Sequence, residues 1–583
     1  MMHEKFYVSS TVSFAELGIY AGCVAHADFL VASPGRSRNS EVQLVFCGEC
    51  FPSDEAESSQ SWIVNQYKRI GDRCVEQLNG HFSGLLVDCR QNKAFLFNDR
   101  YGLERIYVHE SNGETYFASE AKALLAVLPE LRAFDEAGVA QYLAYGCTTG
   151  ERTLFRGIYL LPGGSKWTVA SGEVQKKSRY FRPEAWEAQE PLTGEDFLAE
   201  FSSTFQRILP RYSEHEESVG IALTGGLDTR MVMACLPETE TRHPCYTFVG
   251  ETGQTLDARL AAQIADVKGL KHQVLRIEPD FLRDFESYLD RTITATDGCA
   301  GALASHEIYF NARARELSPI RLTGNFGSEI FRSVSTFKPL ALQRELLSHE
   351  CAAAVASQTQ RAVSEKVHPV TFAAFHEIPW NLYGLLAAGR SQLMFRTPYL
   401  DNELVALAYR APVAQRRSPL PALELIRSTS PELASIPTDR GELLAATALG
   451  HVSRRVFGEL TFKLDYYHKE GLPTFMSPFE PLLNSLASLG LLGLHKFLPY
   501  RRWFQKELPG TIMERVLSER VRQAPWWSKN APERLARAHI SGRANYVREI
   551  NAVLTLEAVD RLFFKEVIPA TSAELGSALT VTI

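Results

Sequence analysis

The chain has 583 residues, of which 45% are hydrophobic and 22% charged, and its formal net charge is −6. This length predicts several domains, and this composition is typical of globular proteins. The chain has no basic excess, which argues against nucleic acid as the main partner, because a protein that tracks a phosphate backbone needs surplus positive charge.

Membrane and secretory segments are not evident in the sequence. The N-terminal residues MMHEKFYVSS lack the basic segment and apolar run of a secretory signal. No stretch approaches the roughly 18 apolar residues that cross a bilayer. The longest candidate, Leu486–Leu498, is interpreted as a buried helix. We therefore predict a cytoplasmic protein without a membrane partner.

The ten cysteines show no regular framework spacing, which fits a reducing compartment. Cys47 and Cys50 form one C-x-x-C, but no second pair stands at zinc-ribbon spacing. We interpret them as structural cysteines rather than as a redox pair or half of a zinc site.

The N-terminal third predicts β-rich structure. Gly84–Asp88 and Ala94–Asn98 are short apolar runs bounded by turn residues, as strands are. Helices are expected at Ser119–Leu128 and at Asp135–Tyr145, where Asp135 is a candidate N-cap.

The proline-containing stretch Arg182–Gly194 ends this part of the chain. It separates two predicted domains, residues 1–185 and 195–583.

Strands and helices alternate beyond this boundary. One helix is expected before Pro237 and an amphipathic one at Leu256–Val267. They separate three short apolar runs that predict strands: Val219–Leu223, Cys245–Val249 and His272–Ile277. This βαβαβ pattern predicts a parallel sheet. A fourth strand is expected at Arg321–Thr323, and after about residue 340 the chain reads mostly helical.

The loop Thr224–Arg230, of sequence TGGLDTR, lies between a predicted strand and a predicted helix. A helix N-terminus presents backbone N–H groups and a positive dipole end, which suit an anion. Gly225 and Gly226 permit unusual backbone angles and close approach of phosphate, and Thr224 and Thr229 offer hydroxyls. Asp228 is unfavourable beside an anion unless a cation is also bound, which points to Mg²⁺.

Other interpretations of this loop are less consistent with its residues. A plain glycine turn with a capping threonine does not account for hydroxyls on both sides and an acid. The loop is not a Walker A loop, because no G-K-[ST] follows, and it lacks the G-x-G-x-x-G of dinucleotide-binding folds. We therefore interpret it as a phosphate site.

The loop resembles the S-G-G-x-D-S pyrophosphate loop of AMP-forming ATP pyrophosphatases. Further motifs resemble the asparagine synthetase family, which includes β-lactam synthetase and lasso-peptide cyclases. In chain order these motifs are Leu78–Gly84 (L-N-G-x-F-A), Asn98–Gly102 (R-D-R-F-G), Phe117–Leu124 (F-A-S-E-x-K-A-L), Leu160–Gly164 (L-x-P-G) and Arg396–Asp401 (R-x-P-F-L-D).

The resemblance implies an N-terminal Ntn-type αββα glutaminase-like domain of α+β class. It also implies a following α/β parallel-sheet synthetase domain of the ATP pyrophosphatase type (PP-loop, adenine nucleotide α-hydrolase-like). That family binds ATP and Mg²⁺, adenylates a carboxylate, releases pyrophosphate and forms an amide with a nitrogen donor.

Site residues follow from the same resemblance by position. Leu223, Val249 and Gly324 would border the adenine and ribose. Pyrophosphate would be held by the loop residues Thr224, Gly225, Gly226, Leu227, Asp228 and Thr229. Asp228 would bind Mg²⁺ and serve catalysis. The partners would be a small carboxylate and a nitrogen donor, and a homodimer is left open.

The glutaminase motifs depart from the family. The family uses an N-terminal cysteine as nucleophile, whereas this sequence starts MMHE and its first thiol is Cys23. The family's N-G-E-I-Y-N segment is unclear near Cys47–Phe51. We expect that glutamine is not hydrolysed and that the domain is a scaffold.

The synthetase motifs depart as well. The S-G-E-G-x-D-E segment appears as Thr323–Glu329, with Ser328 in place of an acid. Glu329 remains, either as a second Mg²⁺ ligand or as an acid favoured by a helix N-terminus. Met394 stands where the family has another acid.

The family's late lysine, whose catalytic role is to steady the acyl-adenylate transition state, is not recognisable either. Arg440 or Lys463 is the candidate replacement, although a solvated surface cation is the simpler interpretation of each.

Three other functions stay open. The first is a glutamine-dependent asparagine synthase in the strict sense. The second is a non-catalytic ATP-binding regulatory or assembly paralogue, motivated by Ser328 and Met394. The third, tRNA thiolation by a related fold, is opposed by the acidic balance and by the N-terminal domain.

Overall fold

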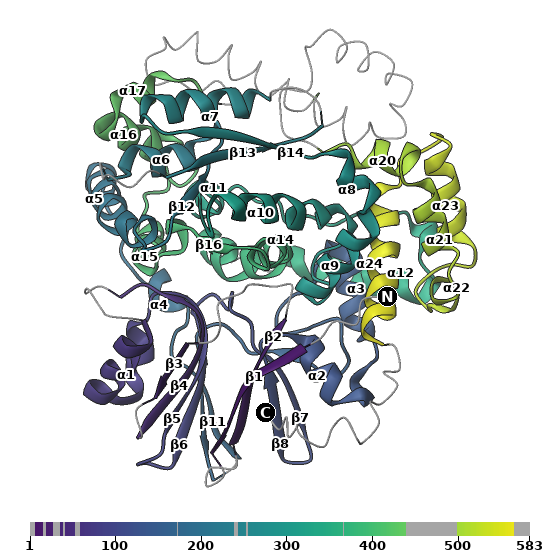
Figure 1. The fold of residues 1–583 in the computed structure, drawn as a ribbon, viewed down its shortest axis with the longest axis horizontal. Helices are drawn as coiled ribbons and strands as arrows, with labels where there is room; N and C mark the ends of the chain where they lie inside the picture. The colour runs from purple at the N-terminus through teal and green to yellow at the C-terminus, as the bar shows by residue number, and fades with distance from the viewer. Residues whose placement is uncertain are drawn as a thin grey trace.

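The computed structural model describes residues 6–14, 19–26, 35–38, 41–52, 59–171, 173–237, 243–251, 255–364, 367–438, 464 and 498–564. Two differently built parts follow one another along the chain and pack together (Figure 1).

The N-terminal part is built on antiparallel sheets. The larger sheet has the strand order β11 (Glu173–Arg179), β10 (Ser165–Ala170), β6 (Lys93–Asn98), β5 (Gly80–Asp88), β4 (Val42–Cys50), β3 (Gly35–Arg38). The smaller sheet has the order β8 (Glu114–Ala118), β7 (Tyr107–Ser111), β9 (Tyr159–Leu160), and β1 (Phe6–Phe14) pairs with β2 (Ile19–His26).

Both faces of the central strands of the larger sheet are buried, and alternate residues of these strands point to opposite sides. On β5, Leu86 packs in the core beneath helix α1 (Ser59–Ile70). Leu85 and Val87 face the smaller sheet, where they meet Val108 of β7. Helix α2 (Ala121–Val127) covers the far side of the smaller sheet. The layers are therefore α, β, β, α, as expected for an Ntn-type domain.

The second part contains a parallel sheet. Its strand order is β14 (His272–Arg276), β13 (Cys245–Val249), β12 (Val219–Ala222), β15 (Ile320–Thr323), β16 (Met394–Arg396). Every neighbouring pair is parallel. On β13, Cys245 packs with α7 (Leu256–Val267), whereas Phe248 stacks on Phe310 of α10 (Ser305–Leu317) from the opposite face. Helices thus cover both faces (Figure 1).

The strand order reverses at the centre of this sheet. The chain passes from β12 outward to β13 and β14, and then returns to place β15 on the other side of β12. In open parallel sheets, ligands bind at the carboxyl ends of the strands, at the point where the order reverses. Helix α6 (Leu227–Cys235) follows β12, and α11 (Gly327–Arg332) follows β15, so the two intervening turns meet at this point.

The remaining elements surround these sheets. They are η2 (Gly71–Gln77), η3 (Pro129–Leu131), α3 (Glu136–Tyr145), α4 (Glu184–Glu187), α5 (Gly194–Ser213), α8 (Pro279–Arg283), α9 (Phe285–Thr296), η4 (Ala302–Ala304), η5 (Arg344–Leu346), α12 (His349–Ser364), α13 (Pro369–Thr371), the π-helix η6 (Phe372–Leu382), α14 (Tyr383–Arg390), η7 (Pro398–Leu400), α15 (Asn402–Tyr409), α16 (Leu420–Thr429), α17 (Pro431–Ser435), α20 (Tyr500–Lys506), α21 (Pro509–Val516), α22 (Glu519–Gln523), α23 (Ala531–Ile540) and α24 (Val547–Phe563).

The predicted strands and helices are confirmed within a few residues. Asp135 is the N-cap of α3, where its side chain accepts a hydrogen bond from the Gly138 amide at 2.6 Å. Helix α1 and the three-residue strand β16 were not predicted. The expected helix at Leu486–Leu498 lies outside the described residues, apart from its last residue. None of the helices that the structure describes is long and apolar enough to cross a membrane.

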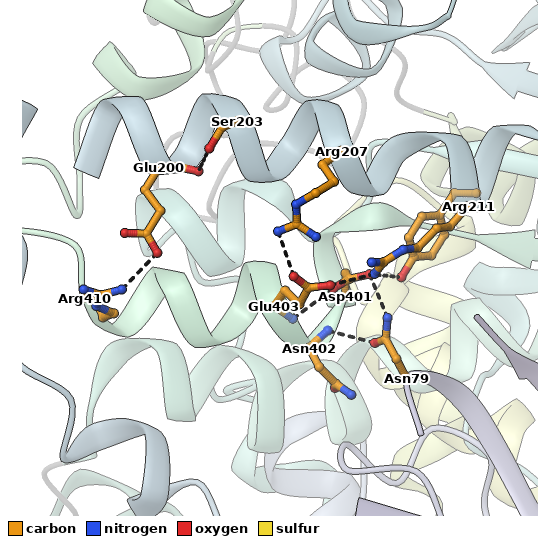
Figure 2. Close-up of polar contacts among 10 residues, drawn as sticks. Asn79, Glu200, Ser203, Arg207, Arg211, Asp401, Asn402, Glu403 and Arg410 are labelled. Carbon is orange, nitrogen blue, oxygen red and sulfur yellow. Dashed lines mark hydrogen bonds and ion pairs between the residues drawn. The ribbon is translucent and has the colours of Figure 1, made fainter. Parts of the chain in front are cut away.

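The two parts are joined through buried polar contacts. Figure 2 shows Asn79, at the start of β5, reaching the loop before α15. Asn79 Nδ2 donates to Asp401 Oδ2 at 2.8 Å, and its Oδ1 accepts from the Asn402 amide at 2.9 Å. Asp401 also accepts from Arg211 at 3.3 Å and from Tyr212 at 3.0 Å. The first residues of the L-N-G motif and the last of the R-x-P-F-L-D motif therefore hold the parts together.

Candidate functional site

The turn between β12 and α6 is braced by its own hydroxyls. Thr224 Oγ1 lies 3.0 Å from Thr229 Oγ1, and Thr229 Oγ1 donates to the Thr224 carbonyl at 3.2 Å. Helix α6 begins at Leu227, directly after Gly226. The free amides of a helix's first turn and its positive dipole end therefore point toward this turn, which suits an anion.

Close packing explains why a glycine is needed at one of the two positions, residue 225. A Cβ on Gly225 would lie 2.7 Å from Leu260 Cδ1, whereas a Cβ on Gly226 would meet only Thr224 Oγ1, at 3.5 Å. Neither glycine uses the left-handed backbone conformation that it is free to adopt. Gly226 has φ −75° and ψ 173°, and Gly225 is not among the residues with positive φ. Gly225 is needed because the absence of a Cβ leaves room for the Leu260 side chain.

The turn after β15 lies directly on the turn after β12. A Cβ on Gly324 would be 2.5 Å from the Thr229 amide nitrogen, and one on Gly327 would be 2.7 Å from Asp228 Cγ. Between these glycines, Phe326 has a φ of +77° and is 5% exposed. A left-handed conformation is costly for a bulky residue, and such strain clusters at functional sites.

Each of the two turns carries a carboxyl group, and the two groups influence each other electrostatically. Asp228 Oδ2 forms an ion pair with Arg332 Nη2 at 2.7 Å. Burial, together with the negative charge of Asp228, raises the pKa of Glu329 to about 7. Ser328, which stands where the family has an acid, donates to Glu329 Oε2 at 3.2 Å. Two carboxyl groups close enough to oppose each other's ionisation favour a cation between them.

These residues fit a magnesium ion that arrives with a nucleotide. Mg²⁺ is commonly held by one or two carboxylates together with substrate phosphates, which matches Asp228 and Glu329. Over the described part of the chain, no group of three or more His, Cys, Asp or Glu side chains could hold a metal by itself. Substrate phosphates would therefore have to complete the coordination.

Contacts from distant parts of the chain hold the turn in place. Asp257 Oδ1 accepts a hydrogen bond from the Gly225 amide at 2.9 Å, and Tyr399 Oη donates to the Asp228 carbonyl at 2.7 Å. The buried Arg230 donates to the carbonyls of Gly225 and Pro437, both at 3.0 Å. Asp257, Tyr399 and Pro437 lie 32 to 207 residues from the groups that they contact, so no local sequence pattern indicates them.

The other predicted site residues fall into two groups. Leu223 and Val249 are buried at the ends of β12 and β13, so only their main-chain atoms can border a nucleotide. The Leu223 carbonyl already accepts from Thr247 Oγ1 at 2.6 Å. Arg440 and Lys463 lie outside the described residues, and their assignment stays a prediction.

The structure also places the glutaminase-like motifs. Arg396 of the second part donates hydrogen bonds to both carboxylate oxygens of Glu49. Its Nε lies 3.2 Å from Oε2, and its Nη2 lies 2.7 Å from Oε1. Cys47 Sγ lies 3.5 Å from Glu104 Oε1, and Arg390 pairs with Glu104. Burial raises the pKa of the Cys50 thiol to about 12. Cys47 and Cys50 are both free cysteines.

Comparison with known proteins finds one family match in each of the two parts of the chain. Residues 52–181 match the glutamine amidotransferase domain family, and residues 200–381 match the asparagine synthase family. Both matches lie within the two parts described above. The fold is thus an Ntn-type domain followed by a parallel-sheet domain of the adenine nucleotide α-hydrolase type.

Individual relatives are distant. Glutamine-hydrolyzing asparagine synthetase 2 of Bacillus subtilis is 25% identical over 365 residues, which cover 57% of this chain and 48% of that protein. Glutamine-hydrolyzing asparagine synthetase 1 of the same organism is 21% identical over 291 residues, covering 49% of this chain and 45% of that protein. A Mycobacterium tuberculosis relative is 24% identical over 48% of this chain and 44% of its own length. The chain spans about half the length of the curated relatives that it matches.

The chain belongs to the asparagine synthase family with an N-terminal glutamine amidotransferase domain.

Proposed function

We propose that the protein is an ATP-dependent ligase that adenylates a small carboxylate, releases pyrophosphate and joins the acyl group to ammonia or an amine. One observation carries this proposal. The turn 224–229 and the turn 323–329 pack on each other where the strand order of the parallel sheet reverses, and each contributes an acid.

In this proposal, each part of the site has a role in the first half-reaction. The main-chain amides at the start of α6, from Leu227 onward, bind the phosphates that leave as pyrophosphate, where negative charge accumulates. Asp228 and Glu329 hold Mg²⁺, which when bound neutralises that charge. The hydrogen bonds from Tyr399 and Arg230 fix the turn, so that the α-phosphorus and the carboxylate keep a productive alignment.

The N-terminal domain is proposed to be a scaffold that does not hydrolyse glutamine. Two of its polar side chains support this role. Glu49 is bound by Arg396, and the Asn79 amide is used at both ends by Asp401 and Asn402. These contacts join the domains and leave neither group available for a substrate. Ammonia or an amine would then reach the synthetase site without help from this domain.

A pyrophosphate-release screen tests the proposal. Purified protein is incubated with ATP, Mg²⁺ and one carboxylate at a time, and each reaction receives ammonia, glutamine or no nitrogen source. The proposal predicts AMP and pyrophosphate in equal amounts with one carboxylate class, stimulated by ammonia. Glutamine should give no glutamate.

The screen also separates the alternatives. Aspartate-dependent turnover with glutamate release would identify a glutamine-dependent asparagine synthase in the strict sense. ATP binding without AMP formation on any carboxylate would identify a non-catalytic paralogue and would refute the proposed ligase. The protein is proposed to act on small molecules in the cytoplasm, without a nucleic-acid partner.

A further inference from the structure

In the structure, Arg332 already forms an ion pair with Asp228, the acid that is proposed to bind the metal ion. Arg332 is the last residue of α11, and its Nη2 lies 2.7 Å from Asp228 Oδ2. The Arg332 side chain is 21% exposed and that of Asp228 is 17% exposed, so the pair lies at the rim of the site.

The pair is placed where the site's own charge is unfavourable for a nucleotide. Asp228, Glu329 and Asp257 all lie at or beside the turn that is proposed to bind phosphates. An ATP molecule would bring several further negative charges to this place. A resident guanidinium offsets part of this repulsion before any metal ion arrives.

Arg332 has binding capacity left over. A guanidinium carries five N–H donors in a planar fork that matches phosphate oxygens. Asp228 takes one nitrogen, and within the described residues no second hydrogen bond or ion pair of the Arg332 side chain is found. The side chain is partly exposed beside Asp228, which leaves room for a further partner.

We propose that Arg332 is a phosphate-binding residue, which contacts the β- or γ-phosphate of ATP while Asp228 holds it in place. This inference rests on the proposed function, because it presumes that the turn binds ATP. Because Ser328 stands where the family has an acid, a second metal ion is harder to bind at this site. Arg332 would supply the positive charge in its place.

Equilibrium binding tests the inference without depending on turnover. ATP affinity is measured by isothermal titration calorimetry, with Mg²⁺ and again with EDTA, for wild type, Arg332→Gln and Arg332→Lys. Arg520→Gln is the matched control, since Arg520 forms a comparable ion pair with Asp560 at 2.8 Å on α22 and α24, away from the two turns (Figure 1). Thermal unfolding of each variant shows whether it is folded.

We expect Arg332→Gln to bind ATP about 10- to 100-fold more weakly than wild type with Mg²⁺, the loss expected for one charge-assisted hydrogen-bonding group. It should also bind ATP more weakly than wild type when EDTA removes the metal ion. Arg332→Lys, which keeps the charge, should fall between them, and Arg520→Gln should match wild type. If folded Arg332→Gln binds ATP as tightly as wild type, or more tightly, Arg332 is only a structural partner of Asp228 and the inference is overturned. If wild type itself does not bind ATP with Mg²⁺, the proposed function fails first.

Discussion

Adding a single methyl group at Gly324 should displace the phosphate-binding turn. A Cβ at this position would lie 2.5 Å from the Thr229 amide nitrogen and 2.8 Å from the Asp228 carbonyl carbon. Non-bonded heavy atoms prefer separations of about 3.5 Å or more, so the two turns must move apart by roughly 1 Å in Gly324→Ala. Both atoms belong to the main chain, so a side-chain rotation cannot relieve the contact.

The expected losses follow from this displacement. Overpacking of this kind costs about 1–3 kcal/mol of folding stability. A shift of about 1 Å at a catalytic site can cost 10²-fold in rate, because reacting groups lose their alignment. We therefore expect Gly324→Ala to bind ATP at least about tenfold more weakly, a loss of about 1.4 kcal/mol.

A graded series of alanine variants makes this prediction specific. The contact of Gly225→Ala is with a side-chain methyl, Leu260 Cδ1 at 2.7 Å, so its effect should be smaller. Gly510→Ala meets nothing within 4 Å and should behave as wild type. ATP titration calorimetry and thermal unfolding measure the two quantities. Unchanged ATP affinity in a folded Gly324→Ala variant would refute the idea that the turns must stay in contact.

Other predictions concern the metal ligand, the domain contact and pH. Asp228→Asn should lower AMP formation by at least about tenfold through loss of the metal-binding charge, with a folded protein by circular dichroism; undiminished turnover would exclude Asp228 as the ligand. Asn79→Ala removes two buried hydrogen bonds, of 2.8 and 2.9 Å. It should lower the free energy of unfolding, measured in urea, by about 2–4 kcal/mol. An unchanged free energy of unfolding would show that this contact does not stabilise the protein. His539 is fully buried, and burial lowers its pKa to about 4 from 6.5. Between these pH values the unfolded chain binds more protons, so wild type should lose up to about 3 kcal/mol as the pH falls from 6.5 to 4. His539→Gln should lack this share of the loss when the two are compared by urea unfolding at pH 7 and 4.5; equal losses would contradict a buried neutral imidazole.

Strongly patterned elements could be predicted from sequence. The strands of Cys245–Val249 and His272–Arg276 and the helix between them follow from apolar runs and from helical periodicity. Strand β16 has three residues, Met394–Arg396, and is defined by its pairing with β15 rather than by its own pattern. Helix α1 was missed although Ile63, Val64 and Tyr67 are buried on one face, a spacing that the sequence does contain.

The candidate site likewise combines residues that could be predicted from sequence with residues that could not. The turn Thr224–Thr229 is local in sequence, so its glycines, hydroxyls and acid could be read together. The groups that complete it are not local. Arg332 lies 104 residues and Tyr399 lies 171 residues from Asp228 along the chain. The parallel sheet brings them together, by placing the ends of β12, β15 and β16 side by side.

The central claim is that residues 224–229 hold the β- and γ-phosphates of ATP. The most direct test is an experimentally determined structure of the protein with Mg²⁺ and an ATP analogue that cannot be cleaved between the α- and β-phosphates. We predict the two outer phosphates within the turn 224–229, against the first main-chain amides of α6, with the metal ion on Asp228. A nucleotide bound elsewhere while the analogue is present at saturation would contradict the assignment.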